Sequence, residues 1–151
     1  MNSSTASGPK PGPLSGIKVV EYAVFHAGPG ATAILGDLGA DVIKVESPSG
    51  DPLRNWRRLS AGSFVLPNEK NLLFELSNRN KRGLCVDITQ PEGRRVFEKL
   101  IADADVFLSN VRKSTRGKLG LDYETIKEIN PKIIQASVSG YGPEGTVADV
   151  G

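Results

Sequence analysis

The sequence has one cysteine, one histidine and only 6% aromatic residues, and it contains no long apolar run. Because Cys85 has no partner, no intrachain disulfide can form, which favours a reducing, cytoplasmic compartment. No stretch of about 18 apolar residues is present, so a membrane-spanning helix is not expected. The N-terminus also lacks the charged-then-apolar order of a secretory signal.

An excess of charge of one sign is missing as well, since 19 basic residues stand against 17 acidic ones. A nucleic-acid-binding protein needs a concentrated basic surface, so nucleic acid is not expected as a partner. With His26 as the only histidine, spacing assembles neither a Ser/His/Asp triad nor a metal cluster. What is present is a 151-residue chain with 38% apolar residues, which suffices for one folded unit with a core.

Residues 1–15 are rich in Ser, Gly and Pro and poor in apolar side chains, so we expect a flexible tail. After it, short β-branched runs alternate with helical patterns, an order typical of parallel strands joined by right-handed crossovers. We predict strands at residues 17–22, 40–46, 84–88, 105–109 and 133–138. We predict helices at residues 31–38, 91–103 and 123–129, and a mixture of short helices and loops over 47–82. The fold class is therefore α/β, with a mainly parallel, Rossmann-like sheet and flanking helices.

Ligands of open parallel sheets bind at the carboxyl ends of the strands, where backbone N–H groups can reach an anion. Three segments fall at such positions: residues 23–32, 110–118 and 139–145. The first contains Gly28 and Gly30 but lacks the third glycine of a dinucleotide-binding fingerprint. The second holds four basic residues, which suit phosphate groups. A solvated surface is the alternative explanation of such a charge run.

Three single side chains also stand out. His26 precedes the first predicted helix and could orient a carboxylate, donate to an oxyanion or transfer a proton, although a lone histidine is more often structural. Cys85 alternates with apolar neighbours in a predicted strand, which indicates a buried, inert thiol. Trp56 fits either core packing or a lid over a ligand. From the residues alone, the interpretation ends at an α/β domain with a candidate anion site.

Several ordered motifs resemble the N-terminal part of the CaiB/BaiF family, the family III coenzyme A (CoA) transferases. They are LSGIKVVE at 14–21 with AGP at 27–29, LGDLGADVIKVE at 35–46, NKRGLCVD at 80–87, KLGLDY at 118–123, NPKII at 130–134 and SVSGYG at 137–142. Together they extend over nearly everything after the expected tail. Members of the family include formyl-CoA transferase, carnitine CoA-transferase and α-methylacyl-CoA racemase.

The resemblance implies that residues 16–151 are the N-terminal part of a CoA-binding large domain. It implies a homodimer of two interlocked subunits, with a heterodimer of paralogues as the alternative. It also implies transfer of CoA from an acyl-CoA thioester to a carboxylic acid, in which an aspartate carboxylate attacks the thioester and an aspartyl-CoA intermediate follows. That aspartate is expected beyond residue 151, so Asp149 is not the nucleophile and this chain alone is expected to be inactive.

The same register implies a set of CoA-binding residues: Val24, Phe25, Ala27, Val86, Asn110, Val111, Thr115 and Lys118. Lys118 stands where the family has an arginine, which keeps the charge. His26 stands where formyl-CoA transferase has an active-site glutamine, and it is the catalytic candidate within this chain. Ser47 stands where an arginine contacts the nucleotide end, so the acyl substrate is not inferred by analogy with formate or oxalate. CoA or acyl-CoA is the expected co-substrate, and no metal is expected.

Two alternatives stay open at this point. A 2-methylacyl-CoA racemase of the same family would exchange an α-proton by acid/base catalysis and would transfer no CoA. A non-catalytic CoA-binding subunit or fragment would bind the co-substrate without turnover. In the transferase hypothesis, the small-molecule partners are an acyl-CoA and a carboxylic acid.

Overall fold

The computed structural model of the protein describes residues 11–56, 58–59, 62–63, 65–67 and 69–148. Residues 1–10 of the expected tail, together with Asp149, lie outside these ranges. Residues 12–15, which were expected in the same flexible tail, are attached to the fold instead. The Leu14 N–H donates to the Leu38 carbonyl at 3.0 Å, and the Leu14 side chain packs against a small cluster that contains Val19 and Val42.

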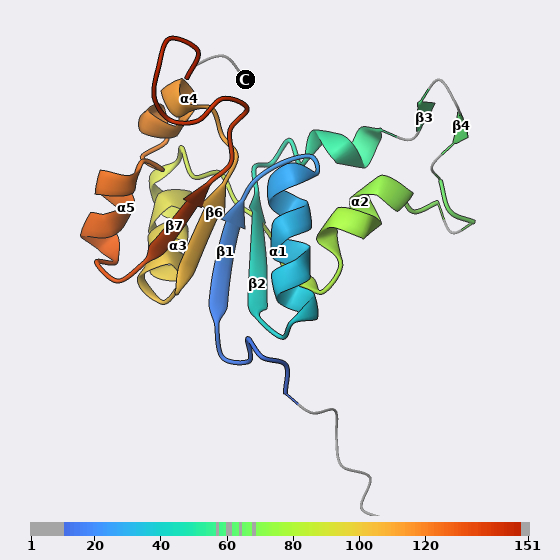
Figure 1. Ribbon diagram of the computed structural model, residues 1–151, viewed down its shortest axis with the longest axis horizontal. Coiled ribbons are helices and arrows are strands. Elements are labelled where there is room, and N and C mark those ends of the chain that lie inside the picture. Colours follow the sequence, from blue (N-terminus) through green and yellow to red (C-terminus); the bar gives the residue numbers. More distant parts are fainter. Residues whose placement is uncertain (1–10, 57, 60–61, 64, 68, 149–151) are drawn as a thin grey trace, which may run out of the picture.

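Five strands form one parallel sheet in the order β5-β2-β1-β6-β7. Their bounds are β1 (Lys18–Tyr22), β2 (Asp41–Glu46), β5 (Lys81–Cys85), β6 (Val106–Ser109) and β7 (Ile134–Ser137). Because all pairings are parallel, the carboxyl ends of the five strands share one edge of the sheet, which is the upper edge in Figure 1, where β1 points upward. The strands β2 and β5 lie on one side of β1 in the sheet, and the strands β6 and β7, which come later in the chain, lie on its other side. The order of the strands therefore reverses between β1 and β6, where open α/β sheets bind ligands.

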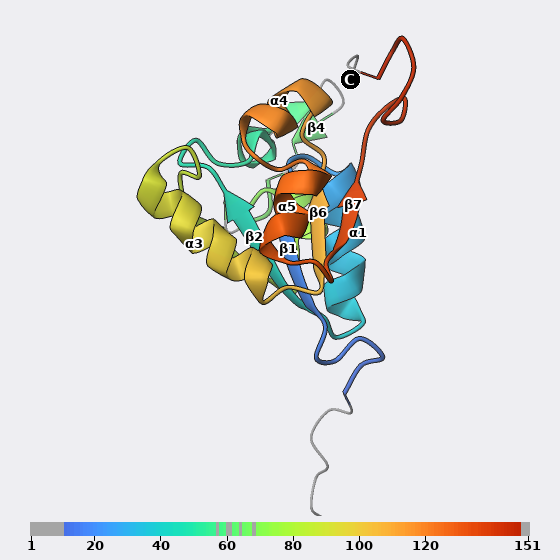
Figure 2. The same cartoon turned by 90° about the vertical axis from the view of Figure 1, so that its left-hand side faces the viewer.

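Helices cover both faces of the sheet (Figure 2). The helical segments are α1 (Ala27–Asp37), the 3₁₀ helix η1 (Pro52–Asn55), α2 (Leu72–Asn78), α3 (Pro91–Ala102), α4 (Lys113–Lys118) and α5 (Tyr123–Ile129). α3 and α5 lie on one face and α1 on the other, and β3 (Arg58–Leu59) with β4 (Gly62–Ser63) forms a separate antiparallel pair. Among the described residues, no helix has the length and apolar character needed to cross a membrane.

The larger hydrophobic core fills the space between the sheet and the α3/α5 layer. Phe97 of α3 is fully buried, and its ring makes edge-to-face contacts with Tyr22 and Phe107. Ile101 lies one helical turn further along, and Ile126 of α5 completes the same cluster. The stripe expected for this helix was Val96, Leu100 and Ile101: Ile101 is buried and Leu100 packs against the core, but Val96 is 42% exposed and Phe97 takes the buried position instead.

The predicted order of strands and helices is confirmed, but the bounds of two elements differ, and the first of these is α1. The helix begins at Ala27 and not at residue 31, because the Gly28-Pro29-Gly30 segment is its first turn. Pro29 is tolerated there since a first-turn N–H has no partner within the helix. A Cβ on Gly28 would lie 2.8 Å from the Cβ of Ala23 and 3.0 Å from Leu108, so the helix approaches the sheet as closely as it does only with glycine.

A second difference concerns β5, which spans Lys81–Cys85 and not residues 84–88. Its register pairs Val42 with Lys81 and Glu46 with Cys85. The basic residues at its start join the sheet because an acidic side chain neutralises each of them, as Asp41 does for Arg82 at 2.6 Å. Because β5 is an edge strand, Cys85 is exposed, and the prediction of a buried thiol is wrong.

Candidate functional site

A cavity of about 360 Å³ opens at the carboxyl edge of the sheet, where the strand order reverses. Its walls come from the start of α1, from the segment after β6 and from the end of β7 with the loop that follows. The lining residues are Ala27, Asn110, Val111, Arg112, Lys113, Arg116, Ser137, Val138, Ser139, Gly140, Gly142, Pro143 and Ala148. The three segments predicted from the strand ends therefore contribute to one cavity.

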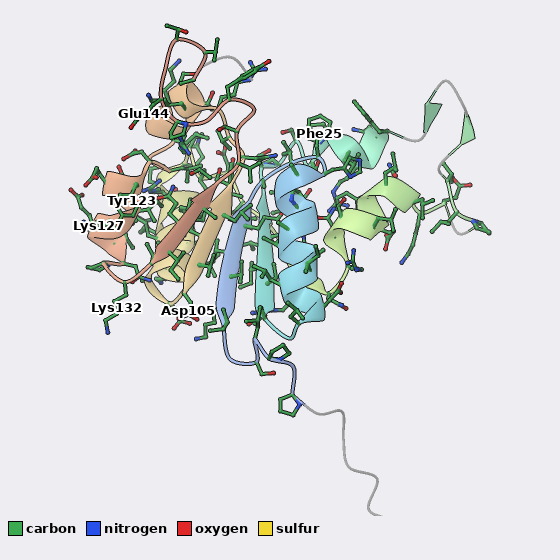
Figure 3. All side chains as sticks on the ribbon, viewed as in Figure 1. Phe25, Asp105, Tyr123, Lys127, Lys132 and Glu144 are labelled. Atoms are coloured by element: carbon green, nitrogen blue, oxygen red, sulfur yellow. The ribbon has the colours of Figure 1, made fainter. Side chains whose placement is uncertain are left out.

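Figure 3 shows the two ends of the sheet by their labelled side chains. Phe25 and Glu144 lie at the carboxyl edge, near the cavity-forming segments, whereas Asp105 and Lys132 lie at the opposite, amino edge. This separation means that the candidate site uses residues that follow strands and not residues that precede them.

Asn110 joins the first two walls of the cavity. Its Nδ2 donates to the Val24 carbonyl at 2.7 Å, and its Oδ1 accepts from the Val24 N–H at 3.0 Å. The side chain thus behaves like one more residue of the β1–β6 ladder, which ends at the pair Tyr22 and Ser109. As a result, the loop after β1 and the loop after β6 are held in a fixed relation beside the cavity.

Three cations line the cavity, and the charge of one of them, Arg116, helps to lower the pKa of the Asp122 carboxyl. Arg116 Nη1 donates to Ser137 Oγ at 2.5 Å, and Lys113 Nζ donates to the Pro143 carbonyl at 3.1 Å. Within the described ranges, neither these two residues nor Arg112 forms a salt bridge with a carboxylate. Their positive charge is therefore available to an anionic ligand, and phosphate oxygens are the matching acceptors.

Other arginines of this chain have a different environment. Arg54 lies 2.6 Å from Glu46, and Arg79 lies 2.5 Å from Asp37. Hydrogen bonding from Arg79 holds the pKa of Asp37 below its usual value. For Glu46, burial acts to raise the pKa, but hydrogen bonds from Arg54 and from the Asp51 N–H bring it below the usual value. Arg54 and Arg79 therefore fit the explanation of a basic run as an ordinary charged surface. The basic residues after β6 do not fit it, because they line a cavity and form no salt bridge within the described ranges.

His26, the catalytic candidate, lies beside the cavity but does not line it. It is the residue before α1, and its Nδ1 lies 2.8 Å from Ser77 Oγ on α2. Phe25 has a positive φ of 61°, and its ring makes an edge-to-face contact with Trp56 at 5.3 Å. Trp56 is 46% exposed, so it covers Phe25 from outside and is not a core residue.

The other predicted CoA-binding residues lie in three places. Val24 and Val111 line a smaller cavity of about 50 Å³ between the ends of β1 and β2, and Val86 packs against the core at the end of β5. Thr115 and Lys118 are exposed on α4, outside the cavity lining. Sequence reasoning missed Ser137, because a serine inside a predicted strand carries no signal of a site. In the described part of the chain, no three His, Cys, Asp or Glu side chains gather as metal ligands would.

The fold and the cavity define an α/β domain with a cationic site at its topological switch point. Residues 14–151 match the sequence profile of CoA-transferase family III. Because the match covers almost the whole chain, the chain belongs to this family, and the resemblance inferred from the motifs is confirmed.

The names of similar proteins also refer to CoA-transferases or to the CaiB/BaiF family. The chain is 42% identical over 137 residues to the cinnamoyl-CoA:phenyllactate CoA-transferase of Clostridium sporogenes, covering 91% of this chain and 33% of that protein. It is 40% identical over 138 residues to the succinyl-CoA–L-malate CoA-transferase beta subunit of Chloroflexus aurantiacus, covering 91% and 33%. A CaiB/BaiF family protein from Brucella suis matches with a TM-score of 0.82 and 42% identity, over 93% of this chain and 37% of that one. The chain therefore spans about a third of the length of these relatives.

Proposed function

We propose that this chain supplies a CoA-binding surface of an enzyme that transfers CoA from an acyl-CoA thioester to a carboxylic acid. One observation carries the proposal: three cations that form no salt bridge within the described part of the chain line a cavity at the topological switch point of the sheet. CoA carries a diphosphate and a 3′-phosphate, and Arg and Lys donors at such a site form charge-assisted hydrogen bonds with phosphate oxygens.

The proposed binding set begins with the three predicted residues that line the cavity, Ala27, Asn110 and Val111. To these we add the cations Arg112, Lys113 and Arg116. Val24, Phe25 and Val86 are proposed to shape the adjoining surface, and Thr115 and Lys118 to act from the outer side of α4. His26 is proposed as a polar group beside the reacting end, held by Ser77.

The covalent step is proposed to use an aspartate of the longer protein. Its carboxylate would attack the thioester carbonyl, which expels CoA as the thiolate and leaves an acyl anhydride on the enzyme. Attack of the thiolate on the aspartyl carbonyl would then give the aspartyl-CoA intermediate and release the first acid. The short coverage of the relatives supports a nucleophile beyond residue 151, and with it a chain that binds CoA without turnover.

The proposed assembly is a dimer, and α1 supports it. The helix carries Asp37 as its only charged residue, yet Ile34 is 56% exposed and Leu38 is 40% exposed on its outer side. Leu76 of the neighbouring α2 is 53% exposed. A helix that is apolar on all sides is normally covered on all sides, and we propose that a second subunit covers this one. Light scattering should show association that Ile34→Glu weakens and Val96→Glu on α3 does not.

A cytoplasmic location is part of the proposal. It is supported by Cys85 as the only cysteine, which leaves no intrachain disulfide, and an exposed thiol of this kind persists best in a reducing compartment. Acyl-CoA is then available to the site without export.

Calorimetric titration of the chain with CoA tests the proposal. Replacing Arg112 and Arg116 by Gln should weaken binding at least about tenfold, because each lost charge-assisted hydrogen bond contributes roughly 1.5–3 kcal/mol. The matched control replaces Arg79 and Arg82 by Gln, which removes the same charge far from the cavity and should leave the affinity within about twofold. Equal losses in both double variants, or no binding by the unsubstituted chain, would contradict the proposal.

A further inference from the structure

A cluster of four buried charged residues lies directly beneath the loop that follows β1. It consists of Glu21 on β1, Lys44 on β2, Asp51 in the loop after β2 and Lys81 on β5, and we call it the buried charge cluster. Each of these side chains is at most 2% exposed. Two cations face two anions, so the formal charges of these buried side chains balance.

The four side chains form one connected network. Glu21 accepts from Lys44 Nζ at 2.8 Å through one oxygen and from Lys81 Nζ at 2.7 Å through the other. Lys44 Nζ also lies 3.0 Å from Asp51 Oδ2. Thr32 of α1 donates its hydroxyl to Glu21. Removal of any one member would leave the buried cluster with one formal charge that is not balanced.

The network also binds the backbone of residues 23–29 at three places. Lys44 Nζ donates to the Ala23 carbonyl at 2.8 Å, and Lys81 Nζ donates to the Pro29 carbonyl at 2.7 Å. Asp51 Oδ1 accepts from the Phe25 N–H at 3.1 Å. Phe25 is the residue with a φ of 61°, a conformation that an aromatic side chain rarely adopts. The loop is thus fixed in an unfavourable conformation by charged groups below it.

Stability alone does not explain a cluster of this kind. Burial lowers the pKa of Lys81 even though the Glu21 carboxylate acts in the opposite direction, so desolvation of the ammonium group is unfavourable. Apolar side chains of similar volume often stabilise a buried site as well as an ion pair does. What they cannot do is bind two carbonyl groups and one N–H group of a loop in defined directions.

We propose that the buried charge cluster is a positioning device for the CoA site, and that Asp51 acts through the Phe25 N–H to hold residues 23–29 in their binding conformation. The identity of the ligand, CoA, rests on the proposed function. The statement that Asp51 holds residues 23–29 in one conformation does not depend on CoA. The segment it fixes includes Val24, which Asn110 binds, and Ala27, which lines the cavity. None of the four charged side chains lines that cavity itself.

The test combines Asp51→Ala with the conservative variant Asp51→Asn, which keeps an oxygen that can accept from the Phe25 N–H. Amide hydrogen exchange is measured at Phe25 and at Phe107, which is fully buried in the sheet. In Asp51→Ala, exchange at Phe25 should accelerate at least about tenfold more than exchange at Phe107, and the CoA dissociation constant should rise about tenfold. Asp51→Asn should restore both values to within about threefold of the unsubstituted chain.

Asp105→Ala is the matched control, because Asp105 also accepts from a backbone N–H, that of Lys18 at 2.8 Å, but lies at the opposite, amino edge of the sheet. It should leave the exchange at Phe25 and the CoA affinity unchanged. Equal acceleration at Phe25 and Phe107 in Asp51→Ala would overturn the proposal, as would an unchanged CoA affinity. If the unsubstituted chain binds no CoA, the proposed function fails, and the exchange at Phe25 still decides whether Asp51 positions the loop. If Asp51→Ala does not fold, loss of Phe25 protection in Asp51→Asn with Phe107 still protected would overturn it.

Discussion

Asn110 and Val24 exchange two hydrogen bonds, 2.7 Å and 3.0 Å long, across the point where the strand order of the sheet reverses. An amide side chain can satisfy both the N–H and the C=O of one residue in this way, because it carries a donor and an acceptor side by side. The pair therefore links the loop after β1 to the loop after β6, and both loops contribute to the cavity.

Asn110→Ala should destabilise the chain by about 1–3 kcal/mol, because it leaves the N–H and C=O of Val24 without their partner in a half-buried position. It should also weaken CoA binding, since the two walls of the cavity lose their link. Urea unfolding followed by circular dichroism measures the first effect. Asn55→Ala is the control, because Asn55 is an exposed residue at the end of η1, and its substitution should change the stability by less than about 0.5 kcal/mol.

Binding of CoA should depend on salt. The three cations that line the cavity attract phosphate groups, and dissolved salt weakens this attraction. The screening length is roughly 10 Å at 0.1 M salt and falls to a few ångströms at 0.5 M. Raising NaCl from 0.05 to 0.5 M should therefore weaken CoA binding about tenfold. Pantetheine, which lacks the phosphates, should bind with little dependence on salt. A salt-independent CoA affinity would place the phosphates away from Arg112, Lys113 and Arg116.

Most of the fold could be predicted from the sequence, because local patterns define its elements. Helical periodicity predicts α3 and part of its buried side, since Ile101 is buried as expected whereas Phe97 takes the place expected for Val96. The helix α5 ends at Ile129, two residues before Pro131. The start of α1 could not be predicted, since a Gly-Pro-Gly segment is typical of a turn and becomes helical only through close packing of Gly28 on Ala23. The exposure of Cys85 depends on its strand being an edge of the sheet, which no local pattern reveals.

The site was predictable to the level of segments but not of individual side chains. The strand-end rule identified the residues after β6, and the structure separates Arg112, Lys113 and Arg116 from the paired Arg54 and Arg79. The buried charge cluster was not predictable. A glutamate in a strand ordinarily faces solvent, and the partners of Glu21 come from β2 and β5, far away in the sequence.

Asp122→Ala should lower the stability by about 1 kcal/mol at neutral pH, because Asp122 is the N-cap of α5 and accepts from the Thr125 N–H at 3.1 Å. That hydrogen bond is the main cause of a pKa for Asp122 below its ordinary value of 3.8. A lowered carboxyl pKa stabilises the fold above pH 3.8, and this stabilisation is lost as the pH falls through the folded-state pKa. The difference between the variant and the unsubstituted chain should therefore shrink below about pH 4. Lys132→Ala, at an exposed position, should show no such pH dependence.

Phe97→Ala should destabilise the chain by about 3–5 kcal/mol, since it opens a cavity between Tyr22 and Phe107 in the centre of the core. Val96→Ala on the same helix is the matched control, because Val96 is 42% exposed and its loss should change the stability by about 0.5 kcal/mol or less. Thermal unfolding of both variants by calorimetry compares them. Similar melting temperatures for the two would contradict the packing of α3 described above.

The central claim is that CoA binds in the cavity at the carboxyl edge of the sheet. It is tested most directly by following the backbone amide resonances of the ¹⁵N-labelled, 16.1 kDa chain during titration with CoA. If CoA binds there, the largest shifts occur at Ala27, Val111 and Ser139, which line the cavity from its three walls. Shifts that concentrate at the opposite edge of the sheet, around Lys18 and Asp103, or the absence of any shift, would contradict it.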